Sequence, residues 1–218
     1  HLVYRETVKA VAHQHGLVAS FVPKLFAAAA GSGCHLHLSL WQGEQNVTHN
    51  GEGELSVSAS AFLAGVLHHL PGLMALTTPS TNSYRRLRPQ CWSGAYRTWG
   101  FDNREAAVRV PTNPTRPSPT HLEFKTVDGA ANPYLALGAT IAAGLDGMRQ
   151  SRSRPLPVNL DPATLSDFEL ADRQIDLLPQ TLSEAIAALT QDQVLLDALG
   201  ADLGTTILAI RQAEWDAM

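Results

Sequence analysis

Two short segments of the chain alternate strictly between apolar and polar residues. Residues 34–40 read Cys-His-Leu-His-Leu-Ser-Leu, and residues 121–125 read His-Leu-Glu-Phe-Lys. A period of two is typical of a β-strand with one buried face and one open face. We expect the apolar side chains of these strands to be buried, namely Leu36, Leu38, Leu122 and Phe124. The opposite faces would present six polar side chains, those of His35, His37, Ser39, His121, Glu123 and Lys125.

Apolar residues at helical spacing predict three longer helices, over residues 2–15, 56–76 and 133–148. Gly16 should end the first helix, and Pro71 should kink or break the second. Asn132 followed by Pro133 is a favourable start for the third. A capping box opens a further helix at residues 181–189, and helices are also expected at 193–199 and from about 205 to the end.

The remaining segments predict shorter strands and loops. Residues 17–22 are expected to form a strand, and residues 96–101 and 106–110 a hairpin joined through Asp102 and Asn103. Loops are expected over residues 42–53, 111–119 and 151–161, and mixed helix and loop over residues 82–88.

Together these elements predict an α+β fold with a mostly antiparallel sheet. Its polar face would line a cleft, and the three longer helices would cover its other face. A length of 218 residues allows one large domain, which we divide into a main part, residues 1–150, and a helical extension, residues 151–218.

The formal net charge of −4 argues against a nucleic-acid-binding protein, but the charges are unevenly distributed. Seven arginines and Lys125 accompany only three acidic residues between positions 82 and 125, whereas positions 155–218 carry eleven acidic residues and two arginines. Genomic composition could explain the number of arginines but not their clustering. A planar guanidinium group suits carboxylate and phosphate ligands, so the middle of the chain is expected to bind anions.

Cysteine usage and apolar runs indicate where the protein resides. Two cysteines are too few for a disulfide scaffold, no apolar run approaches the roughly 20 residues of a membrane span, and no signal pattern opens the chain. We therefore expect a soluble, cytoplasmic protein that binds no membrane. The chain opens at His1 within a predicted helix, which suggests a fragment.

The two polar strand faces combine residue types that serve phosphoryl transfer. A lone histidine on a strand is commonly a plain surface residue, but here histidine and glutamate, both ligands of Mn²⁺ or Mg²⁺, accompany many arginines. Metal ions and cationic side chains together neutralise a moving phosphate. Glu123 is the one carboxylate on these faces, so further metal ligands must lie elsewhere. Phosphate-loop, dinucleotide-binding and serine-hydrolase signatures are all absent from the sequence.

Five segments in order resemble the catalytic domain of the glutamine synthetases and their amine-ligating relatives. They are residues 21–24, residues 31–40 with the sequence GSGCHLHLSL, residues 82–89 with NSYRRLRP, residues 103–111 with Asn-Arg and Arg-Val-Pro, and Glu123 with residues 130–136. The resemblance covers essentially the whole chain and is weakest beyond about residue 150. It implies a ligase of nitrogen metabolism and glutamine biosynthesis, in which ATP phosphorylates the γ-carboxylate of glutamate and ammonia or an amine then displaces the phosphate.

The resemblance also implies a role for each candidate residue. His35 and Glu123 would bind the Mg²⁺ or Mn²⁺ ion that bridges the nucleotide phosphates. The ATP site would include His37, Ser39, Arg104, Arg109 and His121, and the two arginines would also act in catalysis. The substrate site would include Gly31, Arg86, Trp92 and Lys125.

Several positions depart from the family pattern. Trp92 stands where ammonia-using members carry a flap glutamate, and an indole ring cannot take a proton. Lys125 and His121 stand where arginines are usual, and Ala30 replaces a substrate-binding asparagine. These departures favour an organic amine, such as a polyamine, over ammonia.

The resemblance further implies that a small amino-terminal β-grasp domain and several metal-binding glutamates lie upstream of this chain. The chain alone would then be inactive, and complete sites would form between neighbouring subunits of a homo-oligomeric ring, a dodecamer. An alternative is a catalytically retired relative that serves as a structural or ligand-sensing protein. A third interpretation is an α+β domain with incidental polar strand faces, which the five matching segments disfavour.

Overall fold

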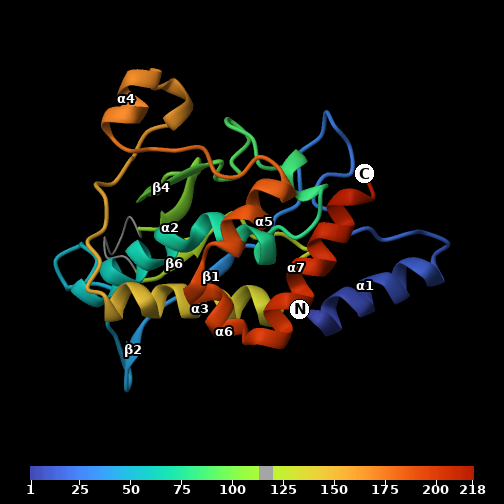
Figure 1. The fold of residues 1–218 in the computed structure, drawn as a ribbon, viewed down its shortest axis with the longest axis horizontal. Coiled ribbons are helices and arrows are strands. Elements are labelled where there is room, and N and C mark those ends of the chain that lie inside the picture. The colour runs from blue at the N-terminus through green and yellow to red at the C-terminus, as the bar shows by residue number, and fades with distance from the viewer. Residues whose placement is uncertain (113–119) are drawn as a thin grey trace.

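A four-stranded sheet forms the centre of the protein, whose computed structural model describes residues 1–112 and 120–218 (Figure 1). Its strands lie in the order β1-β6-β5-β4. Their bounds are Leu36–Leu38 for β1, Tyr96–Phe101 for β4, Ala106–Val110 for β5 and Leu122–Phe124 for β6. A separate hairpin consists of β2, Trp41–Gln42, and β3, Gln45–Asn46. The predicted loop over residues 111–119, which includes Arg116, lies mostly outside the described residues.

The two alternating segments form the antiparallel pair β1 and β6. Leu122 and Phe124 are buried, and Leu36 and Leu38 are partly buried against the same hydrophobic core. The strands pair in a register that places His37 opposite Glu123. Both strands are three residues long, so both are shorter than their alternating segments, residues 34–40 and 121–125.

The expected hairpin of β4 and β5 is wrong, because these strands run parallel with Tyr96 opposite Ala106 and Phe101 opposite Val110. Residues 102–105 connect them. The connection turns at Asp102, where φ is 50°, and Asn103 then donates hydrogen bonds to the carbonyls of Val158 and Leu160 at 2.6 and 2.8 Å. These contacts hold the connection against residues 158–160. The strand β5 then starts beside the start of β4, with Ala106 opposite Tyr96.

The long helix α2, Val57–Thr77, lies against α3, Pro133–Arg149, under the sheet. Gly65 of α2 and Gly147 of α3 allow the two helix backbones to meet. A Cβ atom at Gly147 would lie 2.1 Å from the carbonyl oxygen of Ala61, and one at Gly65 would lie 2.3 Å from that of Ala143. The predicted break at Pro71 is wrong, because α2 continues through it. Burial of most of α2 offsets the missing backbone hydrogen bond.

The expected carboxyl-terminal helices are confirmed as α5, Leu182–Thr190, α6, Gln193–Leu199, and α7, Ala201–Asp216, although α7 begins earlier than predicted. Thr181 caps α5 by accepting a hydrogen bond from the backbone of Glu184 at 3.2 Å. The mixed helix and loop expected over residues 82–88 contains the 3-10 turn Ser83–Arg85, whereas the short helix α4, Asp167–Asp172, and the 3-10 turn Pro162–Thr164 were not expected.

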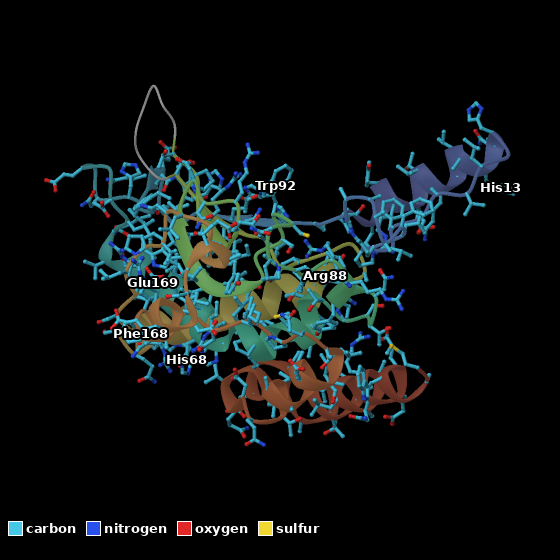
Figure 2. All side chains as sticks on the ribbon, turned by 90° about the horizontal axis from the view of Figure 1, so that it is seen from above. His13, His68, Arg88, Trp92, Phe168 and Glu169 are labelled. Atoms are coloured by element: carbon cyan, nitrogen blue, oxygen red, sulfur yellow. The ribbon has the colours of Figure 1, made fainter. Side chains whose placement is uncertain are left out.

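The amino-terminal helix α1, Leu2–Gln14, projects from the rest of the protein, with His13 near its far end (Figure 2). None of its residues is buried, so it does not cover the sheet as expected. The strand predicted over residues 17–22 is also wrong. No described strand pairs with this segment, and Val18 is 95% exposed.

Among the described residues, α2 is the single helix long and apolar enough to cross a membrane by length and composition, and α6 with α7 passes the same test only as a pair bent by 111°. Of the apolar window in α2, 83% is buried inside the protein. Core helices have the same properties, so this composition is weak support for a membrane span.

A buried histidine joins three helices. His69 of α2 lies between Asp146 of α3, whose Oδ2 is 3.1 Å from Nε2, and Asp192 at the start of α6, whose Oδ2 is 2.7 Å from Nδ1. Arg152 also contacts Asp146, at 3.1 Å. Burial opposes protonation of His69, but the hydrogen bonds with Asp192 and Asp146 outweigh it and raise its pKa above the ordinary value.

We expect His69→Asn to lower the free energy of unfolding by about 1–3 kcal/mol near pH 6, since one buried carboxylate loses its donor. Because the folded-state pKa is raised, the stabilisation is complete below about pH 6.5 and is lost as the pH rises through the folded-state pKa. The difference in the free energy of unfolding between wild type and variant, measured by urea denaturation, should therefore narrow as the pH rises above 6.5.

His13→Gln, at the exposed end of α1 (Figure 2), is the matched control and should match wild type throughout. A wild-type advantage over His69→Asn that does not change with pH would contradict the interpretation.

Candidate active site

Glu123 is the centre of a polar cluster on the face of the sheet opposite to Leu122 and Phe124, and this face is largely buried at Glu123 and Lys125. It is 3% exposed, and its Oε1 lies 2.8 Å from Nδ1 of His35 and 3.8 Å from Nε2 of His37. Its other oxygen, Oε2, contacts Nε of Arg109, which lies opposite on β5. Burial alone would raise the pKa of Glu123, but the bond to His35 and the charge of Arg109 lower it to about 2. The carboxylate is therefore ionised at neutral pH.

His35 reaches Glu123 from the segment just before β1. Gly33 gives the imidazole room, because a Cβ atom at Gly33 would lie 2.7 Å from Nε2 of His35. An imidazole nitrogen and a carboxylate oxygen side by side are ligands suited to Mn²⁺ or Mg²⁺. Within residues 1–112 and 120–218, however, no group of three or more His, Cys, Asp and Glu side chains could hold a metal ion. The pair fits part of a divalent-metal site.

The other polar strand residues surround this pair. The ring centroids of His37 and His121 are 5.0 Å apart, and burial followed by the charge of His37 lowers the pKa of His121. Lys125 is 4% exposed, and burial lowers its pKa while the nearby Glu123 acts to raise it. Ser39 is exposed and accepts a hydrogen bond from Nε1 of Trp41 at 2.8 Å.

Arg86 lies beneath the loop that carries Gly31. A Cβ atom at Gly31 would lie 2.6 Å from Cγ of Arg86. The guanidinium of Arg86 is buried and donates to the backbone carbonyls of Lys125, Thr126 and Val127, while its Nε has no partner. Arg86 and Gly31 are therefore adjacent, next to the end of β6.

Trp92 and Arg104 lie apart from the Glu123 cluster. Trp92 is 66% exposed on the loop before β4, with a φ of 52°, and the Arg104 guanidinium lies 6.0 Å from its ring centroid. The structure therefore brings Arg109, and not Arg104, to Glu123.

Glu105 was not singled out by the sequence analysis. It is 7% exposed, and its Oε1 accepts a hydrogen bond from the backbone N–H of Trp92 at 2.9 Å. No alternating pattern could have indicated it, because Glu105 precedes β5 and is distinguished by its burial and by its bond to Trp92.

The chain matches the family described as glutamine synthetase, catalytic domain, over residues 1–218. The chain belongs to the glutamine synthetase family. It is 45% identical over 217 residues to the gamma-glutamylpolyamine synthetase GlnA3 of Streptomyces coelicolor, covering 98% of this chain and 47% of that protein. It is 39% identical over 215 residues to a glutamine synthetase of Thermus thermophilus, covering 98% of this chain and 48% of that protein.

Solved structures of the glutamine synthetase family share the fold. A structure described as a GmaS/ADP complex superposes with a TM-score of 0.86 at 38% identity, covering 99% of this chain and 49% of that one. The α+β fold predicted from the sequence is thereby confirmed. The chain spans about half the length of the curated relatives it matches.

Proposed function

We propose that this chain is the catalytic part of an ATP-dependent carbon–nitrogen ligase. The enzyme joins ammonia or an amine to the γ-carboxylate of glutamate in two steps. ATP first phosphorylates the carboxylate, and the nitrogen nucleophile then attacks the γ-glutamyl phosphate and displaces inorganic phosphate.

The observation that carries this proposal is the cluster of His35, Arg109 and Glu123 on adjacent strands. Its ionised carboxylate and imidazole suit Mg²⁺ or Mn²⁺, and such an ion would supply charge neutralisation at the nucleotide phosphates. Arg109 is bound to Glu123 through Nε, and its terminal nitrogens have no other acceptor among the described residues. They can therefore bind the transferred phosphoryl group.

The remaining candidates take roles according to their position. His37, Ser39, His121 and Arg104 are proposed to contact ATP. Gly31, Arg86, Trp92 and Lys125 are proposed to contact glutamate or the amine. The adjacency of Gly31 and Arg86, and the location of Lys125 beside Glu123, support one continuous substrate site.

We propose an organic amine, such as a polyamine, as the nitrogen donor. Trp92 cannot accept a proton, and its exposed ring offers an apolar surface for a carbon chain. The relative of 45% identity is a gamma-glutamylpolyamine synthetase, which agrees with this substrate class.

The metal site needs ligands beyond those in the described part of this chain. We propose that they come from additional sequence of the kind present in the longer relatives, and that complete sites form between subunits of a homo-oligomeric ring. The chain by itself should then be inactive.

The test is ATP-dependent phosphate release by the full-length ligase with glutamate and a panel of ammonia, butylamine, putrescine and spermidine. We expect release above the amine-free background, greater with organic amines than with ammonia, and none without glutamate. Background release with every amine would contradict the proposal and favour a catalytically retired relative.

A further inference from the structure

Glu105 lies directly before β5, the strand that carries Arg109 of the Glu123 cluster. The next strand residue but one, Ala107, accepts a hydrogen bond from the backbone N–H of Lys125 at 2.9 Å. Glu105 is therefore a second buried carboxylate, placed near the Lys125 end of the cluster.

The carboxylate of Glu105 is buried, and only one of its two oxygens has a hydrogen-bond partner. Oε1 accepts the hydrogen bond from the Trp92 backbone, whereas Oε2 is buried without a partner. In the part of the chain that the structure describes, no Lys, Arg or His nitrogen lies within 4.0 Å of either oxygen. Burying a polar or charged group without a partner is costly, so this oxygen is suited to a ligand that brings a donor and a positive charge.

The form of the site favours an ammonium group over a metal ion. Glu105 belongs to no described cluster of metal-ligating side chains, and a single carboxylate cannot supply the six or more oxygens that divalent ions such as Ca²⁺ take. An ammonium group needs only a few acceptors and can lie against an aromatic ring. The hydrogen bond to the Trp92 backbone ties the carboxylate to the loop that carries such a ring.

We propose that Glu105 binds a non-reacting ammonium group of a di- or polyamine substrate and so determines amine specificity. The inference rests on the proposed ligase function. The nitrogen that attacks the acyl phosphate must be uncharged, so the group that remains paired with Glu105 is a different one. Ammonia has a single nitrogen and cannot fill both positions, whereas a di- or polyamine carries a second one.

The test compares Glu105→Gln with wild type in the full-length ligase, with putrescine and butylamine as substrates of equal carbon length. Glutamine keeps an oxygen that can accept from the Trp92 backbone and removes only the charge. We expect kcat/KM for putrescine to fall by about 10- to 100-fold, as for loss of one charge-assisted hydrogen bond. For butylamine it should stay within about twofold. Glu44→Gln, in the exposed turn between β2 and β3, is the matched control and should leave both values unchanged.

A second measurement separates this inference from the ligase proposal. Putrescine binding, followed by calorimetry without ATP, should weaken by about tenfold or more in Glu105→Gln. Equal losses of kcat/KM for putrescine and butylamine would overturn the inference, because Glu105 would then only support the Trp92 loop. An unchanged affinity for putrescine in Glu105→Gln would also overturn it. If wild type released no phosphate with any amine and still bound putrescine in a way that depends on Glu105, the ligase function would be overturned. That result would still support the amine-binding site at Glu105.

Discussion

Replacing Glu123 with glutamine is expected to lower kcat/KM of the full-length ligase by more than about 100-fold. Loss of a group that only supports a metal ligand typically costs 10- to 100-fold, so a direct ligand should cost more. The substitution also removes the negative charge that His35 and Arg109 both contact, and the one oxygen of glutamine can accept from only one of the two in the same way.

The measurement that isolates the metal is nucleotide affinity as a function of Mg²⁺ or Mn²⁺ concentration. Wild type should bind ATP more tightly as the metal is added, and Glu123→Gln should have lost most of that gain. Glu52→Gln, an exposed residue in the loop before α2, is the control. If the nucleotide affinity of wild type did not respond to either metal, the assignment of His35 and Glu123 as metal ligands would be contradicted.

Gly147→Val is expected to destabilise the chain by about 4 kcal/mol or more, or to prevent folding. The added side chain would begin 2.1 Å from the carbonyl oxygen of Ala61 and 2.6 Å from the backbone of Gly65. These are backbone atoms of α2, which is buried on nearly all sides and cannot move away. Overpacking against flexible side chains usually costs about 1–3 kcal/mol, so overpacking against a rigid backbone should cost more.

Gly138→Ala is the matched control in the same helix α3, because nothing lies within 4 Å of its added Cβ atom. This variant should raise the free energy of unfolding by about 0.5–1 kcal/mol, since alanine favours a helix over glycine. Urea denaturation of the chain measures both changes. A Gly147→Val variant as stable as Gly138→Ala would show that the helices do not pack as described.

Short-range patterns predicted the elements that depend on neighbouring residues. Alternation over residues 121–125 predicted β6 together with its buried face, because Leu122 and Phe124 must leave water together. Asn132 and Pro133 predicted the start of α3, where the Asn132 side chain accepts from the backbone of Tyr134. The failures at residues 17–22 and at the β4–β5 pair share one cause. Whether a segment becomes a strand, and in which direction it pairs, depends on partners distant in the sequence.

The same division applies to the candidate site. Motif resemblance and alternation brought out His35, Arg109 and Glu123, and the structure brings these three together. It separates Arg104 from them and adds Glu105, whose importance arises from burial and from a bond to Trp92 thirteen positions away. No local pattern encodes the burial of a single carboxylate.

By itself, the sequence determined the family resemblance, the residue types of the site and most of the helices, because these depend on side-chain chemistry and local spacing. Only the tertiary structure decided that β4 and β5 run parallel, that α2 and α3 meet at two glycines and that His69 joins two distant aspartates. Each of these depends on atoms far apart in the chain, which approach one another only when the core is packed.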